Sequence, residues 1–233
     1  MVDQEFVYIG PRKIEIWPEN QPITPVVSPI MTTRFNDTGQ YHEALISKIL
    51  SVEHELRRTS PPKTRCLGGQ KIHKAIHEKW DCPELDLVKA RALALFKRAL
   101  KAKRAHIDGF WINIYRQWES IGPHCHRRAM ASLVYCVDNG DEDPDCPMSG
   151  RFSFVDPRIE ACCQLEAGHM THPLMPELTA GTMLIFPGHL LHAVAAYAGT
   201  RPRITIAWNI NDRLLPGSLG DAFEAPPGAT EKA

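Results

Sequence analysis

The amino-acid sequence predicts a mainly β protein with flanking α-helices, arranged as a sandwich or jelly roll that helices buttress on one sheet. Two observations favour this fold class. Two N-terminal stretches repeat apolar residues at helical spacing, and after residue 109 many short β-prone stretches alternate with turns. Helices that precede a run of strands, instead of alternating with them, argue against a parallel sheet built of βαβ units.

The beginning of the chain is predicted to be extended. Strands are expected at residues 5–9 and 13–17, on either side of a Gly-Pro turn. Residues 18–40 contain several prolines, which hold the chain in extended conformations.

Two amphipathic stretches are predicted to be the main helices. Apolar residues recur from Leu45 to Leu56 and predict a helix over 41–57. Pro83 begins a longer helix, predicted over 83–104, whose basic last turns complement the helix dipole. Residues 58–80 between them contain Pro-Pro and Gly-Gly pairs and are predicted to be mostly loop.

The rest of the chain is predicted to be the β core. We expect one domain over residues 1–212, with the N-terminal strands and helices in 1–104, the jelly-roll core in 105–212 and a frayed tail in 213–233. The predicted core strands are residues 110–115, 131–137, 151–154, 182–186, 192–196 and 203–209.

Composition narrows the classes of partner and location. Basic and acidic side chains balance at 27 each, so no general charge argument favours nucleic acid or an anionic membrane as partner. No apolar run approaches the ~20 residues that span a bilayer, and the N-terminus lacks a signal-peptide pattern. Seven cysteines at irregular spacings predict reduced thiols, and hence a cytoplasmic protein.

Three histidines are candidate metal ligands. His124 and His126 are two residues apart, and residues i and i+2 of a strand point to the same face. His192, which follows a buried-strand pattern and a turn, is the best third ligand from a neighbouring strand. Imidazole suits iron, zinc, copper or nickel, so the residue types alone leave the metal open.

An arginine downstream of His192 is a candidate anion-binding residue. Arg203 and Thr205 alternate with apolar residues in the last predicted strand, so they share its more polar face. A guanidinium group is a fork of donors that suits a carboxylate. Arg201 shares that face and is the alternative.

The order of motifs resembles a bacterial family of Fe(II)/2-oxoglutarate-dependent oxygenases, within a wider group similar to prolyl hydroxylases. The resemblance covers roughly residues 105–212, and the helix at 83–104 also fits it. The motifs that carry it are His124-Cys125-His126, Ser132-Leu133-Val134-Tyr135, Asp156-Pro157-Arg158, Gly181 to His192 and Arg203 to Asn209.

The resemblance implies a double-stranded β-helix that holds Fe(II), with 2-oxoglutarate as co-substrate beside O2. The substrate would be a small molecule or a peptidyl group that is hydroxylated, with release of succinate and CO2. Carried over residue by residue, the implied metal ligands are His124, His126 and His192. The implied 2-oxoglutarate contacts are Arg203 and Thr205, together with Tyr115 and Asn113 on an earlier strand.

The chain departs from the wider family at two positions. The usual triad contains two histidines and a carboxylate, whereas the second position here is His126. The narrower family often has this histidine. The family also tends to carry a second tyrosine after the Ser-x-Val motif, where this chain has Cys136.

Two other functions fit part of the pattern. One is a three-histidine dioxygenase of the cupin type that uses no 2-oxoglutarate, and the other is a non-catalytic barrel that still binds a metal. Arg203 favours the oxygenase over the first, because a thiol dioxygenase needs no carboxylate anchor there. The presence of all three histidines argues against the second. Residues 68–70 and the acidic loop 138–149 are candidates to cover the mouth of the barrel.

Overall fold

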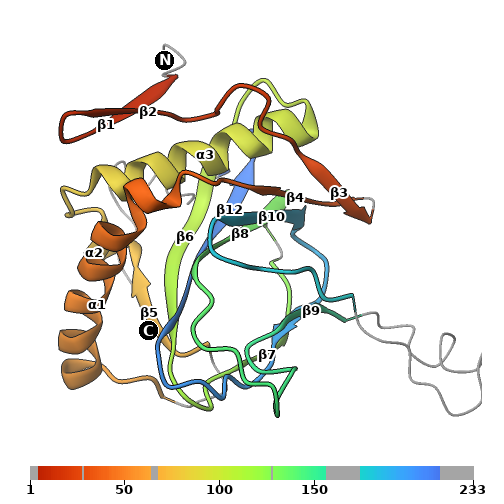
Figure 1. Ribbon diagram of the computed structural model, residues 1–233. Helices are drawn as coiled ribbons and strands as arrows, with labels where there is room; N and C mark the ends of the chain where they lie inside the picture. The colour runs from red at the N-terminus through yellow and green to blue at the C-terminus, as the bar shows by residue number, and fades with distance from the viewer. Residues whose placement is uncertain (1–4, 28, 64–67, 127, 156–173, 216–233) are drawn as a thin grey trace, which may run out of the picture.

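A seven-stranded antiparallel sheet forms the centre of the computed structural model, which describes residues 5–27, 29–63, 68–126, 128–155 and 174–215 (Figure 1). Its strand order is β3-β4-β10-β8-β12-β6-β5. The strands are β3 (Thr24–Val27), β4 (Ile30–Arg34), β5 (Gln70–His73), β6 (His106–Tyr115), β8 (Ala131–Asp138), β10 (Thr182–Pro187) and β12 (Arg203–Asn211).

A second, three-stranded sheet of order β7-β11-β9 faces one side of the large sheet. Its strands are β7 (Ile121–His124), β9 (Phe152–Phe154) and β11 (His192–Val194). Phe152, Phe154 and Val194 of this sheet pack with Leu184 and Phe186 of β10 in one buried cluster. Two packed antiparallel sheets confirm the predicted jelly roll.

The helices cover the opposite face of the large sheet, as Figure 1 shows for α1 (His42–Thr59) and α3 (Pro83–Leu100). Strand β12 shows how the large sheet contributes side chains to a hydrophobic core on each of its faces. Ile204, Ile206 and Trp208 belong to the larger core beneath the helices, whereas Ala207 belongs to the cluster between the sheets. This alternation is the one that the sequence predicts for the strand. The helix-facing residues are apolar because they meet apolar helix stripes.

The N-terminal half contains more β structure than the sequence predicts. Strand β5 and the short helix α2 (Lys74–His77) lie in the segment predicted as mostly loop. The extended segment contains β3 and β4, and β4 adds to the edge of β10. A hairpin of β1 (Phe6–Ile9) and β2 (Arg12–Glu15) confirms the first predicted strands. The added strands are short, and the pairs that attach them to the sheet, β4 with β10 and β5 with β6, join segments that are distant in the sequence and leave little local signal.

Three further local predictions need correction. The long helix ends at Leu100 rather than near 104, because Lys101 adopts a left-handed conformation with φ 52° that caps it. No carboxylate cluster accompanies His73 and His77 in the sequence, which predicts that both lie on the surface, but His77 is buried against Phe110. Strand β7, which holds His124, was not among the predicted strands; it is an edge partner of β11.

Several predicted features lie outside the described residues: the Asp156-Pro157-Arg158 motif and most of the C-terminal tail. The division of the chain into one domain ending near residue 212 stays a prediction. In the part of the chain that the structure describes, no helix is long and apolar enough to cross a membrane. Among those same residues, the structure records four free cysteines and no disulfide.

Candidate functional site

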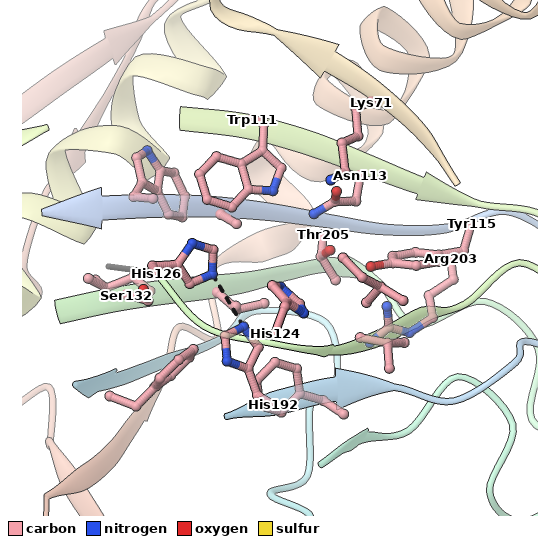
Figure 2. Close-up of a pocket in the computed structure, with 18 residues that line it drawn as sticks. Lys71, Trp111, Asn113, Tyr115, His124, His126, Ser132, His192, Arg203 and Thr205 are labelled. Carbon is pink, nitrogen blue, oxygen red and sulfur yellow. Dashed lines mark hydrogen bonds between the residues drawn. The ribbon is translucent and has the colours of Figure 1, made fainter. Parts of the chain in front are cut away.

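The three predicted histidines converge between the two sheets (Figure 2). His124 ends β7 and His192 begins β11, and these two residues are Cα partners in the antiparallel pair. His126 lies beyond the end of β7, where its backbone N–H donates to the Gly188 carbonyl at 2.7 Å. One nitrogen from each ring lies within 4.8 Å of the others. This spacing brings the three residues close enough to share one ion.

Main-chain carbonyls orient two of the three rings. Nδ1 of His124 lies 2.9 Å from the Gly122 carbonyl, and Nδ1 of His192 lies 2.8 Å from the Leu190 carbonyl. A carbonyl only accepts, so each Nδ1 carries the proton and each Nε2 keeps its lone pair. This is the arrangement in which imidazole binds a metal through Nε2.

The third ring has side-chain partners instead. Nδ1 of His126 lies 3.3 Å from the amide nitrogen of Asn209, and its Nε2 lies 3.3 Å from Nε2 of His192. Trp111 stacks on the ring, with centroids 5.4 Å apart and an interplanar angle of 29°. Asn209 in turn accepts a hydrogen bond from Ser132.

Burial keeps the three imidazoles neutral near neutral pH. It lowers the pKa of His192 to about 3 and that of His126 to about 4, and it lowers the pKa of His124 as well. The positive charge of Lys71 adds to the effect on His124 and His126. A neutral imidazole is the form that coordinates a metal, so the rings need not lose a net proton first.

The predicted anion-binding residues gather on one side of the same pocket. Across the β12–β6 pair, Arg203 is the Cα partner of Tyr115, and Thr205 is that of Asn113. The guanidinium carbon of Arg203 lies 5.1 Å from the centre of the Tyr115 ring. Burial raises the pKa of Tyr115 to about 12, so its hydroxyl stays protonated and can donate to an acceptor.

Arg203 is buried, and one of its guanidinium nitrogens has no hydrogen-bonding partner among the described residues. The residue is 4% exposed, and its Nη1 has no partner among the described residues. Arg201, the alternative from the sequence, is 61% exposed in its side chain and pairs with Asp138 and Asp141 instead. Cys136 faces the same inter-sheet cluster as a fully buried thiol, and burial raises its pKa to about 12.

These residues line one pocket of about 580 Å³, including its open mouth. Its lining contains the metal-ligand candidates, the anion-binding candidates and a rim of apolar side chains, but no aspartate or glutamate from the described residues. The acidic loop 138–149, a sequence candidate to cover the mouth, contributes no lining residue, and neither do residues 68–70. Asp138 and Asp141 of that loop bind Arg201 instead.

Four further residues that surround the histidines were not sequence candidates. Lys71 and Trp111 line the pocket together with Ser132, and Asn209 contacts His126. Asn209 had a signal in the sequence, since it continues the alternation of Arg203 and Thr205 along one strand face. Lys71 had none, because its strand was not predicted.

Comparison with known proteins concerns the fold and the stretch of sequence that carries the site. Residues 109–209 match the profile of a family described as "Putative 2OG-Fe(II) oxygenase". A search of curated proteins finds no match. The fold is similar to AviO1 from Streptomyces viridochromogenes Tue57, with a TM-score of 0.52 and 16% identity, over 80% of this chain and 92% of that one.

The fold is also similar to EctD from S. alaskensis, with a TM-score of 0.53 and 13% identity, over 88% of this chain and 83% of that one. At these identities the likeness concerns the fold. The profile match concerns the stretch that carries all three histidines and Arg203. That stretch, residues 109–209, is similar to the putative 2OG-Fe(II) oxygenase family, an enzyme class that uses Fe(II), 2-oxoglutarate and O2.

Proposed function

We propose that the protein hydroxylates an unactivated C–H bond of a small-molecule or peptidyl substrate, with 2-oxoglutarate as co-substrate. Fe(II), 2-oxoglutarate and O2, when bound together, supply the oxidising chemistry, and succinate and CO2 leave. The proposed metal ligands are His124, His126 and His192. The proposed 2-oxoglutarate contacts are Arg203, Thr205, Tyr115 and Asn113.

The observation that carries the proposal is a buried guanidinium without a partner beside three neutral imidazoles. A buried charge is costly unless a counter-charge offsets it. Nη1 of Arg203 has none among the described residues, and a donor fork of this shape fits a carboxylate. A ligand that chelates the metal and extends a second carboxylate to Arg203 would satisfy both parts of the pocket.

The surrounding residues have separate tasks in this proposal. Thr205 and Tyr115 flank Arg203 and offer hydroxyl donors to the same carboxylate. The apolar walls of the pocket, including the buried Phe152 and Phe186, exclude water from the metal ligands. Excluded water strengthens each electrostatic contact with the co-substrate.

The test is an anaerobic titration of the purified chain. We expect 2-oxoglutarate to bind only when Fe(II) is present and to produce a metal-to-ligand charge-transfer band, and we expect succinate to form once air is admitted. His192→Ala should abolish stoichiometric binding of Fe(II) or Co(II). Full-strength metal binding by that variant would show that the triad is wrong.

One alternative function is an enzyme that binds the metal but does not use 2-oxoglutarate. A three-histidine dioxygenase would bind iron and give neither the band nor succinate with any of several candidate substrates. The buried Nη1 of Arg203, which has no partner among the described residues, favours the oxygenase, because 2-oxoglutarate supplies a carboxylate for it.

A further inference from the structure

A second cation enters the same pocket from another side. Lys71 lies on the edge strand β5, where it is the Cα partner of Asn113. Its side chain is half-buried and lines the pocket, as Figure 2 shows. Among the described residues, no carboxylate or carbonyl is hydrogen-bonded or ion-paired to its ammonium group.

The turn before β5 is shaped around this lysine. Gly68 has φ +89°, and a Cβ added there would lie 3.1 Å from Cε of Lys71 and 3.2 Å from Cδ1 of Ile121. Both neighbours line the pocket. The absence of a side chain at residue 68 therefore leaves the space in which the lysine stem lies.

Lys71 and Arg203 act on different parts of the pocket. Cε of Lys71 and Cδ1 of Ile121 flank the same space at Gly68, and Ile121 begins β7, the strand that ends at His124, whereas the guanidinium of Arg203 lies beside the Tyr115 ring. Lys71 therefore lies toward the metal-ligand candidates. Arg203 lies toward the far end of the proposed 2-oxoglutarate site (Figure 2).

The pocket carries an excess of positive charge even with the co-substrate bound. Its three metal-ligand candidates are neutral, and no aspartate or glutamate among the described residues lines it. The dianion of 2-oxoglutarate offsets a divalent ion in formal charge, which leaves Arg203 and Lys71 as the excess. A cleft with one sign of charge and apolar walls attracts ligands of the opposite sign.

We propose that the substrate is a carboxylate, and that Lys71 binds its carboxylate group beside the metal. This inference rests on the proposed function. One ammonium group matches one monoanion, whereas a phosphate dianion calls for several convergent donors or an arginine fork. The contact sets which part of the substrate reaches the metal, so Lys71 is a specificity-determining residue.

The first arm of the test asks which ligand Lys71 serves. The anaerobic Fe(II) protein is titrated with 2-oxoglutarate, and the charge-transfer band gives Kd for wild type, Lys71→Met and Arg203→Met. We expect Lys71→Met to change Kd by less than about threefold and Arg203→Met to raise it about 30-fold or more. An equal loss in both variants would assign Lys71 to the co-substrate and overturn the inference.

The second arm uses matched probes on the Fe(II)·2-oxoglutarate complex. The probes are N-acetyl amino acids and the corresponding N-acetyl amino acid amides, and the signals are a shift of the band and O2 uptake after mixing with air. We expect at least one carboxylate to bind about tenfold or more tightly than its amide. That preference should vanish in Lys71→Met and persist in Lys71→Arg, which keeps the charge.

The outcomes separate the two proposals. A wild-type protein that gives no band with Fe(II) and 2-oxoglutarate overturns the function and this inference with it. A normal band with no carboxylate preference, or with a preference that survives in Lys71→Met, overturns the inference alone.

Discussion

Two buried arginines lie on opposite faces of the large sheet, and their surroundings differ. Arg91 of α3 is 0% exposed, and Arg203 of β12 is 4% exposed. Arg91 donates to both carboxylate oxygens of Asp37, to the Tyr41 hydroxyl and to the main-chain carbonyls of Glu15 and Ile16. Arg203 has a buried Nη1 with no partner among the described residues.

The difference shows which of the two arginines is fully satisfied without a ligand. On the helix side, every buried charge in this cluster has its counter-charge and its hydrogen bonds, which is what folding alone requires. On the pocket side, the chain holds a cation and an amide oxygen, that of Asn113, without partners. Local violations of this kind are expected at functional sites, where a ligand completes the hydrogen bonding.

The largest effect on folding should come from the satisfied arginine. Arg91→Met leaves the Asp37 carboxylate without its partner, so we expect the free energy of unfolding to fall by about 3–5 kcal/mol. Urea unfolding of the unliganded protein measures it. Lys89→Met on the same helix is the control, since that exposed pair with Asp86 contributes about 0–1 kcal/mol. Equal losses in the two variants would contradict the comparison.

The arginine without a partner should behave in the opposite way. Arg203→Ala should weaken 2-oxoglutarate binding by roughly 2–5 kcal/mol, as for a broken buried charge pair. The free energy of unfolding without ligand should stay within about 1 kcal/mol of wild type, because no hydrogen bond to Nη1 is lost.

The charge-transfer titration and urea unfolding measure these two quantities. Arg201→Ala is the matched control, since that exposed arginine pairs with Asp138 and Asp141 and should leave co-substrate affinity unchanged. Large destabilisation by Arg203→Ala, with normal 2-oxoglutarate binding, would make Arg203 a second structural arginine.

A buried histidine on the helix side should make stability depend on pH. Burial lowers the pKa of His42 to about 4, against an unfolded value of 6.5, although Asp138 and Asp37 partly counteract it and Arg91 adds to it. Between these values the unfolded chain binds the extra proton, so stability is present above pH 6.5 and is lost as pH falls toward 4. Between pH 7.5 and 5, we expect His42 to lower the free energy of unfolding by about 2 kcal/mol.

Urea unfolding at these two pH values tests the assignment. His42→Gln removes the titrating group and can keep a hydrogen bond to the Tyr135 hydroxyl, which lies 2.7 Å from Nε2 of His42. Other buried histidines contribute to the wild-type loss, so the difference between the two proteins is the measured quantity. An unchanged pH dependence in His42→Gln would rule out His42 as its source.

The comparison of the two arginines also explains which strands and site residues could be predicted from the sequence. The central strands were predictable because apolar residues alternate along β12 and β6 toward two different cores. Strand alternation placed Arg203 and Thr205 together, and the family resemblance added Tyr115 to them. The partners of Arg91 lie 50 or more residues away in the sequence, so no local pattern points to them.

The part of the site that was not predicted depends on edge strands and tertiary contacts. Lys71 follows two glycines that favour a loop, yet four residues pair there with β6 and direct the lysine into the pocket. His126 was expected to share a strand with His124, but the strand ends at His124. Contacts with Trp111 and Asn209 hold the His126 ring instead, and sequence spacing cannot reveal them.

Asn209 should show the smallest effect, on metal binding. In the structure its amide nitrogen faces Nδ1 of His126, so the proton of that ring is on Nε2 and points toward His192. A metal needs the lone pair of Nε2. The amide must therefore present its oxygen to Nδ1–H, and Ser132, a hydroxyl that both donates and accepts, can bond either amide orientation.

Asn209→Ala removes the group that holds this tautomer, so we expect Fe(II) or Co(II) binding to weaken about 10–100-fold. Asn209→Asp, whose carboxylate accepts from Nδ1–H, should bind at least as tightly as wild type. Co(II) titration by absorbance measures both. Asn211→Ala on the same strand is the control, because its side chain accepts from the Met130 backbone and lies outside the pocket lining. Equal metal affinities of Asn209→Ala and wild type would show that His126 keeps its ligand form, or does not bind the metal, without Asn209.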